Sequence, residues 1–374
     1  MAGQDDTRLS SLSQGLMMSL VYALSRARVF RVVAPSGPNS PLPVHRHRVT
    51  GTIQTAGDSL RVVALLTEAA TGEIFWTRRW DRLVAEYFAL QDEVVVDIAN
   101  ALANAWSGRI AQLNADISIP RETLDLDAYD LFQRGVAQTA QFTAEGLKAA
   151  EDEFRAALDI DPDYGEAWAC LSIVYGLMTT SASGDTLSVL LEARLYSARR
   201  AYACHPRSPW ALIAGAWAAA HEGNLPEVRA RLDNAVSAAP YNADVLSAAA
   251  GIAVLNADCF DEALLWGNRA LELNETRPRW YRFPIGYAYL MKGDAAAAVK
   301  ELQKGPQNYP ELLAWQAGAA AMIGDDATLR RSSAQLLTIC PSWSVGDYLR
   351  SEPFGSVKTI TRLRQSFAAA GLPD

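Results

Sequence analysis

One stretch of 26 residues decides the fold: AEDEFRAALDIDPDYGEAWACLSIVY, residues 150–175. Pro162 divides it, and because proline lacks a backbone N–H it ends the helix that comes before it. The apolar or small side chains at helical spacing are Ala150, Phe154 and Ala157 before this proline, and Trp168, Leu171 and Tyr175 after it. The stretch therefore predicts two consecutive helices that pack on one another.

The same unit recurs along the chain. The residues that follow the second helix of each unit, spaced 44, 34, 35, 35 and 31, are Pro162, Pro206, Pro240, Glu275, Pro310 and Pro341. The turns inside the later units share this register, with spacings of 35, 35 and 31 between Gly223, Asp258, Gly293 and Gly324. A helix-turn-helix period near 34 predicts a solenoid of stacked repeats.

This period and the pattern Trp168-x2-Leu171-Ser172-x2-Tyr175 resemble the tetratricopeptide repeat, with serine in place of its glycine. The resemblance implies about six repeats over residues 128–341. An insertion at 179–185 and Pro284, inside an expected helix, depart from the pattern. Residues 342–374 are predicted to be a capping helix, and its apolar positions are Phe354, Val357, Ile360, Leu363 and Phe367.

Residues 1–116 follow a different pattern and predict a small, separate α+β domain. A leucine stripe over 9–24 indicates a helix leading into a strand at 30–33, and alternating apolar residues over 49–80 indicate three strands with turns at 56–58 and 71–72. A second helical stripe covers 90–106. Residues 117–127 are the expected linker. The predicted fold class is therefore mostly α, with a small α+β domain followed by an α-helical solenoid.

Three phrases resemble proteins in which a TolB amino-terminal-like domain precedes tetratricopeptide repeats: TGEIFWTRRWDR (71–82), LDAYDLFQRG (126–135) and LRSEPF (349–354). That resemblance implies a bacterial signalling protein, in which these parts usually accompany an adenylate cyclase or winged-helix output domain. The family's opening strand and usual second helix are missing here. The chain is therefore expected to be either a complete adaptor or the sensory part of such a regulator.

Composition excludes several partner classes. The net charge is −8, from 34 basic and 42 acidic residues, so no polybasic surface is expected for nucleic acid or anionic lipid. Three uncharged runs of 13 residues, at 208–220, 245–257 and 312–324, are too short to span a bilayer and are expected to be buried helices. Four widely spaced cysteines and the absence of a signal peptide predict a reduced, cytoplasmic protein.

No motif indicates catalysis, a metal or a cofactor. Asp159, Asp161 and Asp163 have the spacing that opens a calcium loop, but Tyr164 replaces the required glycine. His45 and His47 alternate with arginines on an expected edge strand. No nucleotide-binding, zinc-protease or hydrolase motif occurs, so the chain is predicted not to be an enzyme.

Aromatic side chains supply the candidate binding site. The first helix of each repeat lines the concave groove, and large aromatic groups there can anchor a protein or peptide partner. The predicted groove residues are Trp210, Ile213, Trp217 and His221 in the third unit, and Trp280, Phe283, Tyr287 and Met291 in the fifth. In an alternative interpretation these eight side chains form the core of a tightly wound solenoid, because an apolar stripe at helical spacing usually faces the core.

Overall fold

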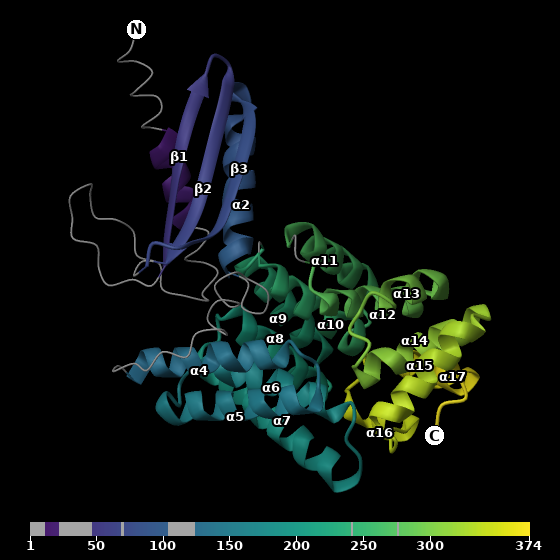
Figure 1. The fold of residues 1–374 in the computed structure, drawn as a ribbon. Coiled ribbons are helices and arrows are strands. Elements are labelled where there is room, and N and C mark those ends of the chain that lie inside the picture. Colours follow the sequence, from purple (N-terminus) through teal and green to yellow (C-terminus); the bar gives the residue numbers. More distant parts are fainter. Residues whose placement is uncertain (1–11, 22–46, 69–70, 104–123, 241, 275–276) are drawn as a thin grey trace. The chain divides into compact units, whose positions relative to one another are not determined.

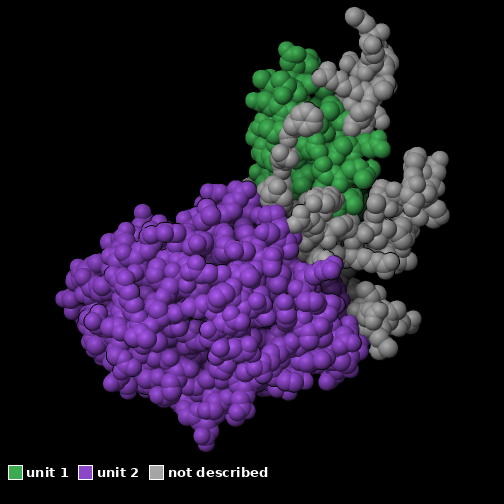
Figure 2. All heavy atoms as spheres, turned by 180° about the vertical axis from the view of Figure 1, so that it is seen from behind, with its two compact units in different colours: residues 1–104 green, residues 105–374 purple. Residues whose placement is uncertain are grey.

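The computed structural model describes residues 12–21, 47–68, 71–103, 124–240, 242–274 and 277–374, drawn in colour in Figure 1. The chain forms two compact units, residues 1–104 and 105–374, which Figure 2 colours separately. The predicted strand at 30–33 and most of the predicted linker lie outside the described residues. None of the described helices is both long enough and apolar enough to cross a membrane.

The first unit contains the predicted three-stranded antiparallel meander, in the order β1 (His47–Ala56), β2 (Ser59–Glu68) and β3 (Ile74–Leu83). Gly57 and Gly72 adopt positive φ at the two hairpin turns, which is why the sequence places glycine there. The alternate side chains of β2 are buried, beginning with Leu60 and Val62. The short 3-10 turn η1 (Val84–Glu86) leads into α2 (Tyr87–Ala103).

Helix α2 packs on the sheet and on the helix at 12–21. The Trp80 indole donates to Asp97 Oδ2 at 2.8 Å, and the Tyr87 hydroxyl donates to the Leu12 carbonyl at 2.6 Å. Leu90 and Val94 of α2 are fully buried. The α+β composition predicted for this part of the chain is therefore confirmed.

The second unit is a solenoid of antiparallel helix pairs (Figure 1). The pairs are α4 (Leu124–Thr139) with α5 (Ala144–Ile160), α6 (Gly165–Thr179) with α7 (Gly184–Cys204), α8 (Pro209–His221) with α9 (Leu225–Ala238), α10 (Ala243–Asn256) with α11 (Phe260–Leu273), α12 (Arg282–Lys292) with α13 (Ala295–Leu302), and α14 (Pro310–Ile323) with α15 (Asp326–Ile339). The first of these begins inside the segment expected to be a linker. The predicted helical-repeat architecture is confirmed.

Local chemistry explains the two departures from the repeat pattern. Pro284 lies in the first turn of α12, after the 3-10 turn η2 (Arg279–Tyr281), where a missing N–H costs no helical hydrogen bond. The insertion near residue 180 extends the second unit: α7 has 21 residues, whereas α9 and α11 have 14.

The predicted turn residues all adopt positive φ: 74° at Gly223, 54° at Asp258, 95° at Gly293 and 71° at Gly324. Glycine adopts this conformation without a steric penalty, and aspartate is one of the few other residues that tolerate it. The regular spacing of these four residues in the sequence therefore reflects the turn positions at which the backbone requires positive φ.

We expect Gly324→Ala to lower the free energy of unfolding by about 1 kcal/mol, because an L-residue is strained at this φ. A Cβ at this position meets no atom within 4 Å, so the loss is a pure backbone effect. Gly251→Ala is the matched control: it also has open space but lies inside α10, where alanine should stabilise the helix. Urea unfolding measures both, and a loss of equal size in the two variants would contradict the turn argument.

The C-terminal region has two helices where one capping helix was expected. These are α16 (Val345–Ser351) and α17 (Val357–Ala369), joined by residues 352–356. Helix α17 covers α14 at Gly318, where an added Cβ would lie 3.2 Å from the Phe367 ring. Helix α16 instead contacts α6 and α7 of the second repeat.

Candidate functional site

The structure places most of the predicted groove residues in the interior of the solenoid. Trp210, Ile213 and Trp217 on α8 are buried, as are Tyr287 and Met291 on α12. The remaining three are His221, which is exposed, and Trp280 and Phe283, which are half-buried. This placement agrees with the alternative that these side chains form the core of a tightly wound solenoid, and their role in binding a partner stays a prediction.

Contacts between distant repeats explain this burial. The Phe142 ring, in the turn of the first unit, lies 5.5 Å from Phe283 and 5.6 Å from Tyr309 between ring centroids. The side-chain amide of Asn308 donates to the Gln141 carbonyl at 3.0 Å. The first repeat thus contacts the fifth and sixth, and the solenoid closes on itself.

The chain's own C-terminal region packs against the second, third and fourth repeats. We call residues 352–355 the tail segment. The indole N–H of Trp217 donates to Glu352 Oε2 at 2.9 Å, and the Asn256 amide donates to the same oxygen at 3.3 Å. The guanidinium of Arg194 pairs with Glu352 Oε1. One carboxylate is therefore held by α7, α8 and α10, which belong to three different repeats.

The Arg194 side chain is held in position by its own neighbours. Its guanidinium carbon lies 3.8 Å from the centroid of the Trp217 ring, a favourable cation–π contact. Helix α6 makes room for it at Gly176, where an added Cβ would lie 2.6 Å from the same carbon. The Ser172 hydroxyl donates to the Arg194 carbonyl at 3.1 Å. A buried cation is costly without an anion, and Glu352 supplies one here.

A second buried carboxylate lies beside this pair. Glu311 of α14 accepts from the Tyr348 hydroxyl at 2.7 Å and from the Tyr309 hydroxyl at 2.8 Å. Burial raises the pKa of Glu311 to about 7; the negative charge of Glu352 adds to this rise, while the two tyrosine hydrogen bonds and Arg194 oppose it. Burial also raises the pKa of Tyr309 and Tyr348 well above the usual value.

The sequence alone does not predict that Arg194, Glu311 and Glu352 form a polar cluster. Glu311 follows Pro310 at the start of a helix, a position where an exposed acidic residue is common because of the helix dipole. Arg194 and Glu352 are 158 residues apart in the chain. The one available signal is the phrase LRSEPF, which indicates a family resemblance but says nothing of the chemistry of its glutamate.

The residues considered for metal binding have structural surroundings. Asp161 caps α5, and its Oδ1 accepts from the backbone N–H of Asp163 at 3.1 Å, as expected for a helix-ending turn. His45 and the side chain of His47 lie outside the described residues. Within the described ranges, no group of three histidine, cysteine or acidic side chains is placed to hold a metal ion.

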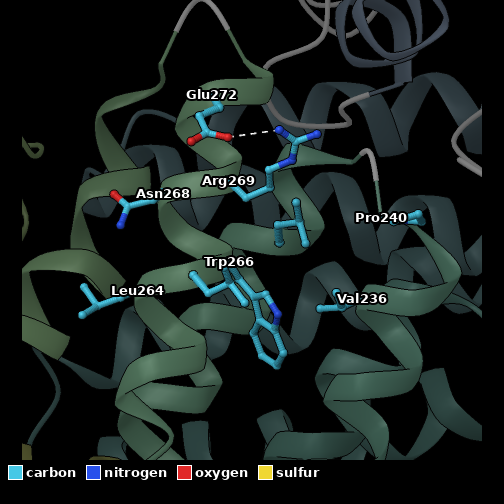
Figure 3. Close-up of a pocket in the computed structure, with 9 residues that line it drawn as sticks. Val236, Pro240, Leu264, Trp266, Asn268, Arg269 and Glu272 are labelled. Carbon is cyan, nitrogen blue, oxygen red and sulfur yellow. Dashed lines mark hydrogen bonds and ion pairs between the residues drawn. The ribbon is translucent and has the colours of Figure 1, made fainter. Parts of the chain in front are cut away.

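The outer face of the solenoid carries a surface pocket of about 440 Å³ between α9 and α11 (Figure 3). Leu265 and Trp266 line it from α11 and Val236 lines it from α9, while Arg269 and Glu272 form a 3.0 Å ion pair at one end. Leu265 is 66% exposed. The pocket is mostly apolar. It is the alternative to the groove as a surface for binding a partner.

Known proteins with a similar sequence or fold cover only part of this chain. No family model matches it. A segment of 132 residues, 34% of this chain, is 33% identical to the Rhizobium meliloti (strain 1021) protein named "Putative adenylate cyclase 3", and spans only about a fifth (21%) of that relative's length.

Solved structures with a similar fold include two tetratricopeptide proteins. TTC0263 of Thermus thermophilus is 19% identical with a TM-score of 0.36, and the match covers 56% of this chain and 99% of that one. YrrB, described as having an unusual peptide-binding site, is 16% identical with a TM-score of 0.31, and the match covers 53% of this chain and 96% of that one.

Proposed function

We propose that this chain is a non-catalytic protein-binding scaffold of a bacterial signalling pathway, and that it takes a protein or peptide segment in the groove of its repeats. One observation carries the proposal: the groove already holds an extended stretch of polypeptide, the tail segment. Side chains from three repeats hold that stretch through a single carboxylate. A surface that binds one extended segment in this way has the geometry needed to bind another.

Site-specific photo-crosslinking in cells tests where a partner binds. A benzoylphenylalanine at His221 probes the groove, because His221 is exposed and stacks on Trp217 with ring centroids 5.5 Å apart. The matched control carries the same probe at Leu265, beside the outer pocket. We expect a partner protein to be crosslinked from His221 and not from Leu265.

Two other results would count against the proposal in different ways. Crosslinking from Leu265 alone would move the binding surface to the outer face, and crosslinking from neither position would contradict the scaffold function. Alanine substitution of Trp217 is unsuitable as a test because this indole is fully buried, so lost binding could follow from lost folding.

A second candidate function is the sensory or regulatory part of an adenylate cyclase. The 33% identity to the cyclase-named Rhizobium meliloti protein favours it. Reading the DNA that precedes the Met1 codon tests this: an in-frame cyclase domain would support it, and an in-frame stop followed by a ribosome-binding site would contradict it. In either case we expect the purified chain to show no cyclase, hydrolase or phosphatase turnover.

A further inference from the structure

We propose that the tail segment is a resident ligand of the groove, and that the partner replaces it with an extended segment bearing a carboxylate of its own. This inference rests on the proposed function and specifies the chemistry of the partner. It assigns Arg194, Trp217 and Asn256 as the residues that recognise the carboxylate.

The recognition site is built from buried donors. Arg194 is 7% exposed, and both Trp217 and Asn256 are almost completely buried. All three donate to one carboxylate, which makes the hydrogen bonds charge-assisted and stronger than neutral ones. An amide or hydroxyl in place of the carboxylate would leave the guanidinium without the anion that it pairs with directly.

The Arg194 guanidinium is packed by groups outside the tail segment. The guanidinium packs between the Trp217 ring and Gly176, and the Ser172 hydroxyl donates to the backbone carbonyl of Arg194, which fixes the main chain that carries it. The cation therefore stays in place when the tail segment leaves. Because an unpaired buried cation is unfavourable, the vacated site selects another anion.

The tail segment uses few other polar contacts with the groove. The Asn256 amide donates to the Pro353 carbonyl at 3.0 Å, and the Gly355 N–H donates to the Leu255 carbonyl at 3.0 Å. The Phe354 ring packs on Tyr348 of its own C-terminal region, with ring centroids 5.8 Å apart. The Glu352 carboxylate is thus the main polar group that this segment presents to the repeats.

One acceptor in the site is left unused by the resident segment. Asn256 Oδ1 is buried, and no described residue donates a hydrogen bond to it. Proline has no N–H, so Pro353 cannot supply one. A partner with any other residue after its carboxylate carries an N–H at that place in its backbone, which gives it one more donor than the resident segment has.

Peptide binding to the full-length chain tests the proposal. The probe is a fluorescent synthetic peptide with the sequence LRSEPFGSVK of residues 349–358, and its partner probe has glutamine in place of the glutamate. The chains are wild type, Glu352→Gln, and the matched control Glu222→Gln, which alters an exposed ion pair with Arg199. Fluorescence anisotropy gives the affinities.

We expect the acidic peptide to bind Glu352→Gln at least about tenfold more tightly than it binds wild type or Glu222→Gln. The glutamine peptide should bind Glu352→Gln at least about tenfold more weakly than the acidic one does. Equal affinity of the acidic peptide for all three chains, or of both peptides for Glu352→Gln, would overturn the proposal.

A measurement on the wild-type chain does not depend on how the variant folds. Excess acidic peptide should accelerate hydrogen exchange in residues 345–356 while α6 and α8 keep their protection. Unchanged exchange in residues 345–356 at millimolar peptide would show that the tail segment is a fixed part of the core, and would overturn the proposal.

Crosslinking from His221 separates this inference from the proposed function. A displaced resident ligand predicts a higher yield of crosslinked partner from Glu352→Gln than from wild type. Equal yields would overturn the resident-ligand inference and leave the scaffold function standing, whereas no crosslinked partner from His221 or from Leu265 in either chain would overturn the scaffold function.

Discussion

Between pH 5 and pH 8 we expect the Glu311→Gln variant to gain about 2–3 kcal/mol of unfolding free energy relative to wild type. The pKa of Glu311 is about 7 in the folded protein, raised by burial from 4.5. The native state therefore binds more protons than the unfolded chain in this window. Wild-type stability from this group is fully present below about pH 4.5 and is lost as the pH rises to 7.

Replacing Glu311 with glutamine removes this titration. The amide oxygen can still accept from one of the two tyrosine hydroxyls, and the amide NH2 can donate to the other. Chemical denaturation at several pH values measures the difference between the two proteins. Glu301→Gln is the control: the pKa of Glu301 is lowered although burial opposes the change, because Lys304 and Arg282 both bond to its carboxylate. Its substitution should cost stability by an amount that is constant from pH 5 to 8.

A difference between Glu311→Gln and wild type that does not change with pH would contradict this account. It would mean that the Glu311 carboxylate is hydrated in solution and titrates near its ordinary value.

Removing residues 351–374 should destabilise the last repeats by an amount on the order of a few kcal/mol. Leu312, Leu313 and Trp315 of α14 are completely buried, and so are Leu363 and Phe367 of α17. Without the C-terminal helix, part of this apolar surface meets water, as happens to any solenoid that loses its cap. Ile323 adds little, because it is 45% exposed with the C-terminal helix in place.

Calorimetry and hydrogen exchange check this prediction. We expect the shortened chain to melt earlier and to self-associate, with protection lost first in α12 to α15 and kept in the domain before Ile117. Val357→Ala is the control, because this side chain is 78% exposed and should have no effect. An unchanged melting curve for the shortened chain would show that the C-terminal helix is not a cap.

The sequence by itself determined the repeats and their turns. Gly223, Gly293 and Gly324 are read correctly because positive φ is a local requirement of the backbone, and a proline marks a helix end for an equally local reason. The sheet of the first unit was predictable for the same reason, since β2 alternates buried and exposed side chains. In each case the signal and the structure it predicts lie within a few residues.

The tertiary structure alone decided what covers the groove. A stripe that includes Trp217 shows which face of α8 is apolar, but solvent, a partner or a distant part of the same chain can all lie against such a face. Here that part is Glu352, which lies 135 residues from Trp217 and 158 residues from Arg194. These groups come together because the solenoid closes on itself. Closure results from small rotations between successive repeats that accumulate along the chain, so no local stretch of sequence encodes it.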